Sequence, residues 1–273
     1  MDRYAVMGNP IAHSKSPMIH HLFAEQTNQT LSYEAILVEI DNFNQAVTDF
    51  SDNNGKGLNI TVPFKQDAWQ LASQRTARAE LAGAVNTLSW INGQWHGDNT
   101  DGVGLMHDLI HNHNIMLRDK RVLILGAGGA VRGILSPLIS EQPKSVVIAN
   151  RTVTKAETLA SLFSDTGNVS ASAYQDLSEP FDLVINGTAA SLQGELPPVP
   201  EHCISETTDC YDMMYASDPT PFMHWAGKLG ASKCMDGLGM LVEQAAESFF
   251  IWRQVRPQTQ SVIKTVRQKL LSP

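Results

Sequence analysis

A short apolar run that ends in glycines is the sequence feature that most constrains the fold. Residues 120–133 read KRVLILGAGGAVRG, in which four apolar residues lead directly into a glycine-rich turn. Apolar residues then recur with helical spacing at Val131, Ile134, Leu135 and Leu138. This order is typical of a buried parallel strand that turns tightly into a helix.

The glycines at this turn favour a phosphate ligand. Glycine lets the backbone approach a pyrophosphate, and the free amides and positive dipole end of a helix bind its charge. The third small position of the usual dinucleotide fingerprint falls on Val131, where Gly or Ala is normal. Glycines also serve plain turns, so the prediction depends on the next strand. The candidate phosphate-binding residues are Gly126, Ala127, Gly128, Gly129 and Ala130.

The end of the second strand indicates which dinucleotide the chain uses. Residues 145–149 (SVVIA) form another short apolar run, followed by Asn150, Arg151 and Thr152. An acid that binds ribose would indicate NAD at this point, roughly 20 residues past the glycines, and none is present. Arg151 and Lys155 instead offer charge that suits a 2′-phosphate. The alternative is an ordinary helix start with Thr152 as cap, but we predict NADP.

Composition excludes several classes of protein. The 273 residues suffice for two domains, and the net charge of −8 argues against nucleic-acid and anionic-membrane binding. No run of about 18 apolar residues predicts a membrane span, and the N-terminus shows no signal peptide. Cys203, Cys210 and Cys234 lack a CxxC pair and indicate reduced thiols, so we expect a cytoplasmic protein.

Hydroxyl groups gather near the first predicted helix. A strand over residues 4–7 leads through a loop to a helix over 18–26, for which Ser16 is the expected N-cap before Pro17. Capping does not explain Ser14, and the two hydroxyls together could hold a carboxylate. A strand over 31–40 and a helix over 42–50, capped by Asp41, follow.

The segment LNITVPFK places polar groups beside a lysine. Strand alternation puts Leu58, Ile60 and Val62 on one face and Asn59 and Thr61 on the other, and Pro63 is expected to end the strand. Lys65 then opens a helix, where the dipole disfavours a cation, which suggests another purpose. A strand starting at 83–87, a hairpin turn at Asn92-Gly93 and a polar loop over 97–104 complete this half.

The histidines do not predict a metal site. They lack a convincing carboxylate or cysteine ligand set, and we expect them on helix surfaces. They are His20, His21, His107, His111 and His113.

The second half of the chain fits a doubly wound sheet. We expect strands over 181–186, 209–214 and 232–235, a helix over 221–229 and an irregular proline-rich loop over 196–200. Two last helices, over 240–255 and 258–271, are expected to return to the first domain.

Several sequence blocks together resemble one family. GNPIAHSKSP near the start, NITVPFK, GAVNT, GDNTDGVG, GAGGA, NRT and DGLGMLVEQAA are similar to the shikimate dehydrogenase family, and the match covers essentially the whole chain. The resemblance implies an α/β fold with an N-terminal substrate domain, whose sheet is mostly parallel, and a Rossmann NADP domain. We place the substrate domain at 1–101 with 239–273, and the NADP domain at 102–238.

The resemblance also implies an activity and a set of site residues. The family couples NADPH oxidation to reduction of 3-dehydroshikimate to shikimate, a small-molecule substrate, with Lys65 and Asp101 as the catalytic pair. The implied substrate-binding residues are Ser14, Lys15, Ser16, Asn59, Thr61, Asn86, Asp101, Tyr215 and Gln244. The implied NADP-binding residues are Gly126 to Ala130, Asn150, Arg151, Thr152, Lys155, Thr188, Met213 and Gly237.

The chain departs from the family pattern in two places, and three other functions remain open. Val131 replaces a small residue, and Ala189, Ala190 and Ser191 lie where a serine-rich segment is usual. An acid after the second dinucleotide strand would favour a quinate/shikimate dehydrogenase of broader cofactor use, and none is present. A tetrahydrofolate-type dehydrogenase would not need the paired serines, and a non-catalytic ligand sensor would have lost Lys65 or Asp101. The sequence leaves the oligomeric state at monomer or homodimer.

Overall fold

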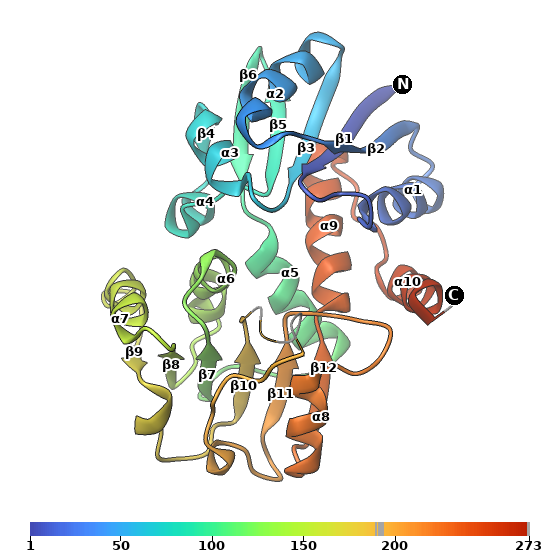
Figure 1. The fold of residues 1–273 in the computed structure, drawn as a ribbon. Coiled ribbons are helices and arrows are strands. Elements are labelled where there is room, and N and C mark those ends of the chain that lie inside the picture. Colours follow the sequence, from blue (N-terminus) through green and yellow to red (C-terminus); the bar gives the residue numbers. More distant parts are fainter. Residues whose placement is uncertain (189, 191–193, 272–273) are drawn as a thin grey trace. The chain divides into compact units, whose positions relative to one another are not determined.

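The computed structural model describes residues 1–188, 190 and 194–271, and divides the chain into two compact units. Unit 1 comprises Met1–Gly104 with Leu241–Gln268, and unit 2 comprises Leu105–Met240 with Lys269–Pro273. The two units are drawn in Figure 1. The domain boundaries expected from the sequence, with breaks after residues 101 and 238, stay a prediction.

Unit 1 is built on a mixed six-stranded sheet with the order β2-β1-β3-β5-β6-β4. Strands β1, β2 and β3 pair in parallel, whereas β5 is antiparallel to β3 and to β6. The strands are β1 Asp2–Gly8, β2 Leu31–Leu37, β3 Gly55–Ile60, β4 Gln74–Arg75, β5 Thr87–Ile91 and β6 Gln94–Asp98. The helices are α1 Ser16–Gln26, α2 Phe43–Asp52, α3 Lys65–Leu71, α4 Ala77–Ala82, α5 Asp101–His107, α9 Leu238–Arg253 and α10 Gln260–Leu271, of which α5, α9 and α10 extend into unit 2.

The two faces of the unit 1 sheet differ in character. Leu58 and Ile60 of β3 pack into an apolar core with Phe43 and Val47 of α2 and Phe64 beside α3. Because successive side chains of a strand alternate between faces, Asn59 points to the opposite face, which α1 and α9 cover. The alternation predicted for Leu58, Asn59 and Ile60 is confirmed.

Some local expectations for unit 1 are wrong. Strand β3 ends at Ile60 rather than at Pro63, so Val62 is not on the apolar face and is 65% exposed. Strand β2 ends at Leu37, and Asn42 rather than Asp41 precedes α2, without a side-chain cap. The polar loop after β6 is short, because α5 already begins at Asp101. The hairpin turn is confirmed, since Asn92 and Gly93 both have positive φ.

Unit 2 is built on a fully parallel six-stranded sheet with the order β12-β11-β10-β7-β8-β9. This order reverses direction beside β7, as in doubly wound folds that bind nucleotides. The strands are β7 Arg121–Leu125, β8 Ser145–Ala149, β9 Val169–Ser172, β10 Leu183–Asn186, β11 Asp209–Asp212 and β12 Lys233–Asp236. The helices are α6 Gly129–Ser140, α7 Val153–Ser161 and α8 Pro221–Lys228, with a π-helical turn η2 at Asp108–Asn112 and short 3-10 turns η3 Tyr174–Asp176 and η5 Glu201–Cys203; unit 1 has η1 Ile40–Asn42.

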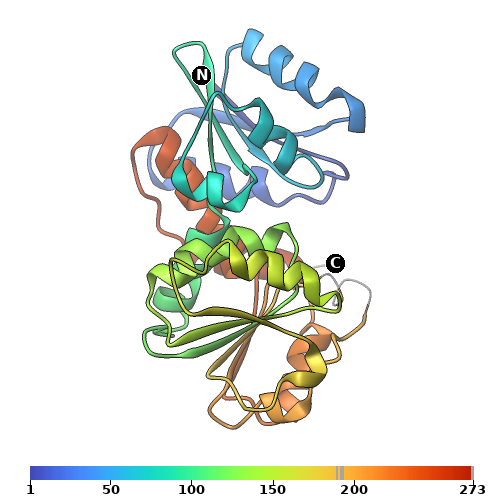
Figure 2. The same cartoon turned by 90° about the vertical axis from the view of Figure 1, so that its left-hand side faces the viewer.

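Helices cover both faces of the unit 2 sheet, as Figure 2 shows. Val122 and Ile124 of β7 pack against α6 and α7, whereas Leu123 and Leu125 pack with Phe222 of α8. A strand that is buried on both faces has a continuous run of apolar residues in its sequence. Such runs at residues 122–125 and 145–149 predict the two strands. The doubly wound fold predicted for this half is confirmed.

His20 lies in the aromatic layer between the unit 1 sheet and helices α1 and α9. Its ring stacks on Tyr33 with centroids 4.1 Å apart, and Phe249 and Trp252 lie within 6.1 Å. The side chain is fully buried, and neither ring nitrogen has a hydrogen-bond partner among the described residues. Burial lowers the pKa of His20 to about 3. The expectation of a helix-surface histidine is therefore wrong for His20.

We expect His20 to make unit 1 sensitive to acid. The unfolded chain takes up a proton near pH 6.5, but the folded state does not until about pH 3. The free energy of unfolding should therefore fall as the pH decreases through this window, by up to about 1.4 kcal/mol per pH unit from this group. Urea denaturation at pH 4 to 7 should show a shallower pH dependence for His20→Phe than for the wild type, and an unchanged one for the exposed neighbour in His21→Phe. An equal slope in all three proteins would contradict the assignment.

Candidate active site

Lys65 and Asp101 form an ion pair at the start of two helices of unit 1. Lys65 is the first residue of α3, Asp101 is the first of α5, and Lys65 Nζ lies 2.5 Å from Asp101 Oδ2. The other carboxylate oxygen, Oδ1, accepts a hydrogen bond of 2.8 Å from Asn86 Nδ2. Both oxygens of Asp101 are thus held, while the Lys65 ammonium, which has three donors and is 29% exposed, can still donate to a ligand.

Asn86 is held in one orientation by its neighbours. Its Oδ1 accepts from the Thr87 hydroxyl and the Thr100 amide, both at 2.9 Å, and its Nδ2 donates to Thr100 Oγ1 at 2.9 Å as well as to Asp101. The side chain is 2% exposed. These bonds occupy the hydrogen-bond donors and the acceptor of the Asn86 amide. Its orientation is therefore fixed, and it holds Asp101 Oδ1 in place.

Asn59 is also engaged by the protein itself. The Tyr33 hydroxyl donates to Asn59 Oδ1 at 2.7 Å, and Asn59 Nδ2 donates to Ser248 Oγ at 3.0 Å and Thr87 Oγ1 at 3.3 Å. The Ser248 hydroxyl in turn donates to the Gln244 carbonyl at 3.0 Å, one turn earlier in α9. Sequence reasoning missed Tyr33, Thr87 and Ser248, since only pairing across the sheet and with α9 gives these residues a role.

Gln244 lies at the margin of this polar network, and Thr61 lies two residues after Asn59 in the chain. Gln244 Nε2 donates to the Leu241 carbonyl at 2.7 Å, and its Oε1 accepts a long bond of 3.4 Å from Asn86. Thr61 follows β3 directly, and its amide donates to the Met7 carbonyl at 3.0 Å. Its hydroxyl makes no hydrogen bond with another described residue and is available to a ligand.

The serines near α1 are arranged differently from the expectation. The helix begins at Ser16 with Lys15 as N-cap and no side-chain cap, and Ser14 Oγ accepts a bond of 3.3 Å from the Ser16 amide. Ser16 is thus not the N-cap, because its own backbone already lies in the first turn. Its hydroxyl lies near the Tyr33 phenol, whose pKa burial raises well above the usual 10, so that the phenol stays a donor.

The glycine turn of unit 2 presents open backbone at the start of α6. Gly126 has φ of +105°, which only glycine adopts easily, and its amide donates to the Ala149 carbonyl at 2.8 Å. Gly128, Gly129 and Ala130 are exposed, with no atom near where a Cβ would stand on either glycine. Helix N-termini with accessible amides bind anions, so a pyrophosphate fits here.

A cavity of about 410 Å³ lies beside the end of β8. Arg151 is exposed and makes no ion pair with any described residue, and the same holds for Lys155. Thr152 is the N-cap of α7 as expected, but its hydroxyl does not cap the helix. The cavity is lined by Asn150, Arg151, Val153, Ala173, Tyr174, Gln175 and Pro198 to Pro200. The Arg151 charge lowers the pKa of Tyr174, which burial raises more strongly.

The remaining cofactor candidates follow strands at the same carboxyl edge. Thr188 follows β10 and donates to Asn186 Oδ1 at 2.7 Å, and Met213 and Gly237 follow β11 and β12. Tyr215 lies after β11, and burial together with Asp236 raises its pKa. Of the segment that departs from the family, Ala189 and Ser191 lie outside the described residues.

Val131 is accommodated by a glycine on the neighbouring strand end. A Cβ placed on Gly187 would lie 2.4 Å from Val131 Cγ2, and Val131 itself is fully buried. The small residue that the fingerprint normally has at position 131 is therefore replaced by Gly187, whose missing side chain leaves room for Val131. Gly128 and Gly129 of the same turn stay exposed.

No metal site is found among the residues that the structure describes. Within residues 1–188, 190 and 194–271, no group of three or more His, Cys, Asp and Glu side chains could hold an ion. His113 Nε2 faces Asp108 Oδ1 at 3.7 Å, and His107 packs on His111. In the same part of the chain, no helix combines the length and apolar character that crossing a membrane requires.

Unit 2 has the parallel sheet and glycine turn of a Rossmann nucleotide-binding domain, and unit 1 carries a lysine–carboxylate pair, which together define a nucleotide-dependent dehydrogenase. Family models support this class. They match the shikimate dehydrogenase substrate binding domain at residues 6–88, shikimate/quinate 5-dehydrogenase at 108–193 and the shikimate 5′-dehydrogenase C-terminal domain at 237–267. The chain belongs to the shikimate dehydrogenase family.

Individual relatives are similar to this chain over nearly its whole length. The chain is 58% identical over 266 residues to shikimate dehydrogenase (NADP(+)) of Alkalilimnicola ehrlichii, with 97% of this chain and 98% of the relative covered. An Ael1 enzyme from Pseudomonas putida has 46% identity and a TM-score of 0.94, covering 100% and 99%. Shikimate 5-dehydrogenase from Thermus thermophilus, solved with NADP(H) and shikimate, has 29% identity and a TM-score of 0.89, covering 99% and 100%.

The contact between Val131 and Gly187 gives a stability prediction. Gly187→Ala should lower the free energy of unfolding by about 1–3 kcal/mol, because the new methyl group overlaps Val131. Val131→Ala should recover most of that loss in the double variant, because it removes the overlapping atoms. Urea denaturation of the two single variants and the double variant measures this coupling. Purely additive losses would show that the two side chains do not compete for space.

Proposed function

We propose that this chain catalyses the reversible NADPH-dependent reduction of 3-dehydroshikimate to shikimate, the reaction named for its relatives. The observation that carries the proposal is the Lys65–Asp101 pair, with Asn86 on the second carboxylate oxygen. This arrangement supplies a positioned proton donor beside a fixed anion. A non-catalytic sensor would not need it.

Lys65 is the proposed acid. When the ring carbonyl of the substrate is reduced, negative charge develops on its oxygen, and an ammonium within hydrogen-bond distance stabilises that charge and donates the proton. In the direction of shikimate oxidation, neutral Lys65 accepts the hydroxyl proton. Asp101 orients the ammonium through its Oδ2 atom and accepts a hydrogen bond from a substrate hydroxyl.

The other substrate contacts are assigned to groups that keep hydrogen-bonding capacity for a ligand. The hydroxyls of Ser14 and Ser16 suit the substrate carboxylate, and we also propose Lys15, which lies between them in the sequence, as a contact. The Thr61 hydroxyl and the Gln244 amide suit ring hydroxyls, and we also propose Tyr215 as a contact. Asn59 and Asn86 act mainly by positioning, because their amides are taken up by neighbouring side chains.

NADP is the proposed cofactor, and when bound it supplies the hydride. The turn from Gly126 to Ala130, exposed from Gly128 onward, suits its pyrophosphate, and Asn150, Arg151, Thr152 and Lys155 suit the ribose 2′-phosphate. Thr188, Met213 and Gly237 line the same edge of the sheet. The unpaired Arg151 guanidinium supports NADP over NAD, because a planar fork holds a phosphate at two points.

We propose that the enzyme acts in the cytoplasm as a monomer or homodimer on this small molecule. Free thiols at Cys203, Cys210 and Cys234 support a reducing compartment. Burial raises the pKa of Cys203 to about 11, which makes this thiol unreactive.

Removing the lysine tests the proposed catalytic pair. Lys65→Ala should lower kcat for shikimate oxidation with NADP by roughly 10²- to 10⁴-fold, the usual contribution of a positioned proton donor. KM for shikimate should change much less. The matched control is Lys56→Ala, which removes an exposed lysine of β3 in the same unit and should leave kcat unchanged. Near-normal turnover of Lys65→Ala would remove Lys65 from the mechanism.

Cofactor choice tests the role of Arg151. The wild type should prefer NADP to NAD in kcat/KM with shikimate, and quinate assayed in parallel measures the breadth of the site. Arg151→Ala should reduce the preference by roughly 10- to 150-fold through weaker NADP binding, since a bond to a charged group contributes about 1.5–3 kcal/mol. Lys155→Ala should do less, and Arg118→Ala, which removes another exposed cation of unit 2, should have no effect. Equal weakening of both cofactors by Arg151→Ala would contradict the 2′-phosphate assignment.

A further inference from the structure

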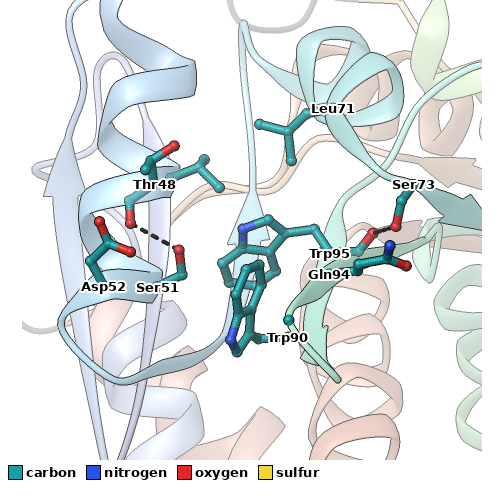
Figure 3. Close-up of a pocket in the computed structure, with 10 residues that line it drawn as sticks. Thr48, Ser51, Asp52, Leu71, Ser73, Trp90, Gln94 and Trp95 are labelled. Carbon is teal, nitrogen blue, oxygen red and sulfur yellow. Dashed lines mark hydrogen bonds between the residues drawn. The ribbon is translucent and has the colours of Figure 1, made fainter.

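A pocket of unit 1 contains none of the residues assigned to the reaction. Its volume is about 330 Å³, and it lies between helix α2, the segment after α3 and the hairpin of β5 and β6 (Figure 3). It is lined by Val47, Thr48, Ser51, Asp52, Leu71, Ser73, Trp90, Gly93, Gln94 and Trp95. All ten residues belong to the described part of the chain.

Two indole rings form one wall of this pocket. The ring centroids of Trp90 and Trp95 are 4.9 Å apart with an interplanar angle of 56°. Trp95 is 7% exposed and belongs to the apolar core, whereas Trp90 is half-buried. Gly93 at the hairpin turn has no side chain to cover them. The faces of indole rings attract cations through their quadrupole.

The hydroxyl groups of the pocket can only accept hydrogen bonds from a ligand. Thr48 Oγ1 donates to the Asn44 carbonyl at 2.9 Å, Ser51 Oγ to the Thr48 carbonyl at 2.8 Å, and Ser73 Oγ to the Trp95 carbonyl at 3.0 Å. Each hydroxyl proton is therefore committed to the backbone, and lone pairs remain. The lining groups that can donate a hydrogen bond to a ligand are the Gln94 amide and the indole N–H groups.

The charge in the pocket is negative and uncompensated. Asp52 is exposed at the end of α2, and its carboxylate makes no ion pair or hydrogen bond with another described residue. None of the ten lining residues is a lysine or an arginine. The nearby Arg3 guanidinium is already bonded to Glu34 and to the Asn53 carbonyl. An anion would meet no cation here.

We propose that this pocket binds a small organic ammonium ion of the quaternary type. Its apolar substituents would pack on Trp90 and Trp95, and its positive charge would face the indole surfaces and the Asp52 carboxylate. Aromatic side chains beside a carboxylate are the chemistry that recognises such ions, which need no hydrogen-bond donor from the protein. The lone pairs of Thr48, Ser51 and Ser73 add to the negative potential.

Choline and 3,3-dimethylbutan-1-ol test the proposal, because they have nearly the same shape and only choline is charged. Binding is measured by saturation-transfer NMR on the full chain and by quenching of tryptophan fluorescence. We expect saturable binding of choline and at least tenfold weaker binding of the alcohol. Asp52→Asn should weaken choline binding roughly fivefold, and Trp90→Leu roughly three- to tenfold.

The matched control is Asp49→Asn, which removes the same charge one turn earlier on the same helix, where the carboxylate accepts from Gln45 and does not line the pocket. It should leave choline binding unchanged. Normal shikimate turnover in each variant shows that the fold is intact. Equal binding of choline and the alcohol, equal effects of Asp49→Asn and Asp52→Asn, or no saturable binding to the wild type would each overturn the proposal.

Discussion

The polar network of unit 1 depends on how the Asp101 carboxylate is held. Its Oδ2 faces the Lys65 ammonium and its Oδ1 accepts from Asn86, so the carboxylate is fixed in position and direction. A buried carboxylate is costly unless its oxygens are paired, and this pairing also fixes where the ammonium can point. The side chains around Asp101 therefore serve stability and the proposed chemistry together.

The support for that carboxylate extends through one face of the sheet. Asn86 is oriented by Thr87 and Thr100, and Asn59 joins Tyr33 of β2 to Ser248 of α9. The side-chain amides of Asn59 and Asn86 are both hydrogen-bonded to their neighbours. Lys65, Thr61 and the serines near α1 keep hydrogen-bonding capacity for a ligand. The opposite face of the same sheet is an apolar core, so strand alternation alone separates packing from chemistry.

Unit 2 differs from unit 1 in presenting exposed backbone, at Gly128 and Gly129 beside the start of α6. Its parallel strands end at one edge, and the residues that follow β7, β8, β10, β11 and β12 meet there. The close approach of α6 to the sheet requires one small residue, and the chain places it at Gly187 instead of at Val131. The departure from the fingerprint therefore preserves packing.

The sequence by itself determined the elements whose pattern is local. The strand at residues 145–149 has the same bounds as predicted, and Lys65 is the first residue of α3. Asn92 and Gly93 form the hairpin turn, and Gly126 has a positive φ. These features follow from apolar runs, glycines and alternation, which act within a few residues. Only the tertiary structure decided the partners of the polar groups. Asn59 and Ser248 are 189 residues apart, His20 is buried against Tyr33, and Ser16 lies inside the helix that it was expected to cap. The physical reason is that burial and hydrogen bonding are settled by which segments pack together, and no local spacing records that choice.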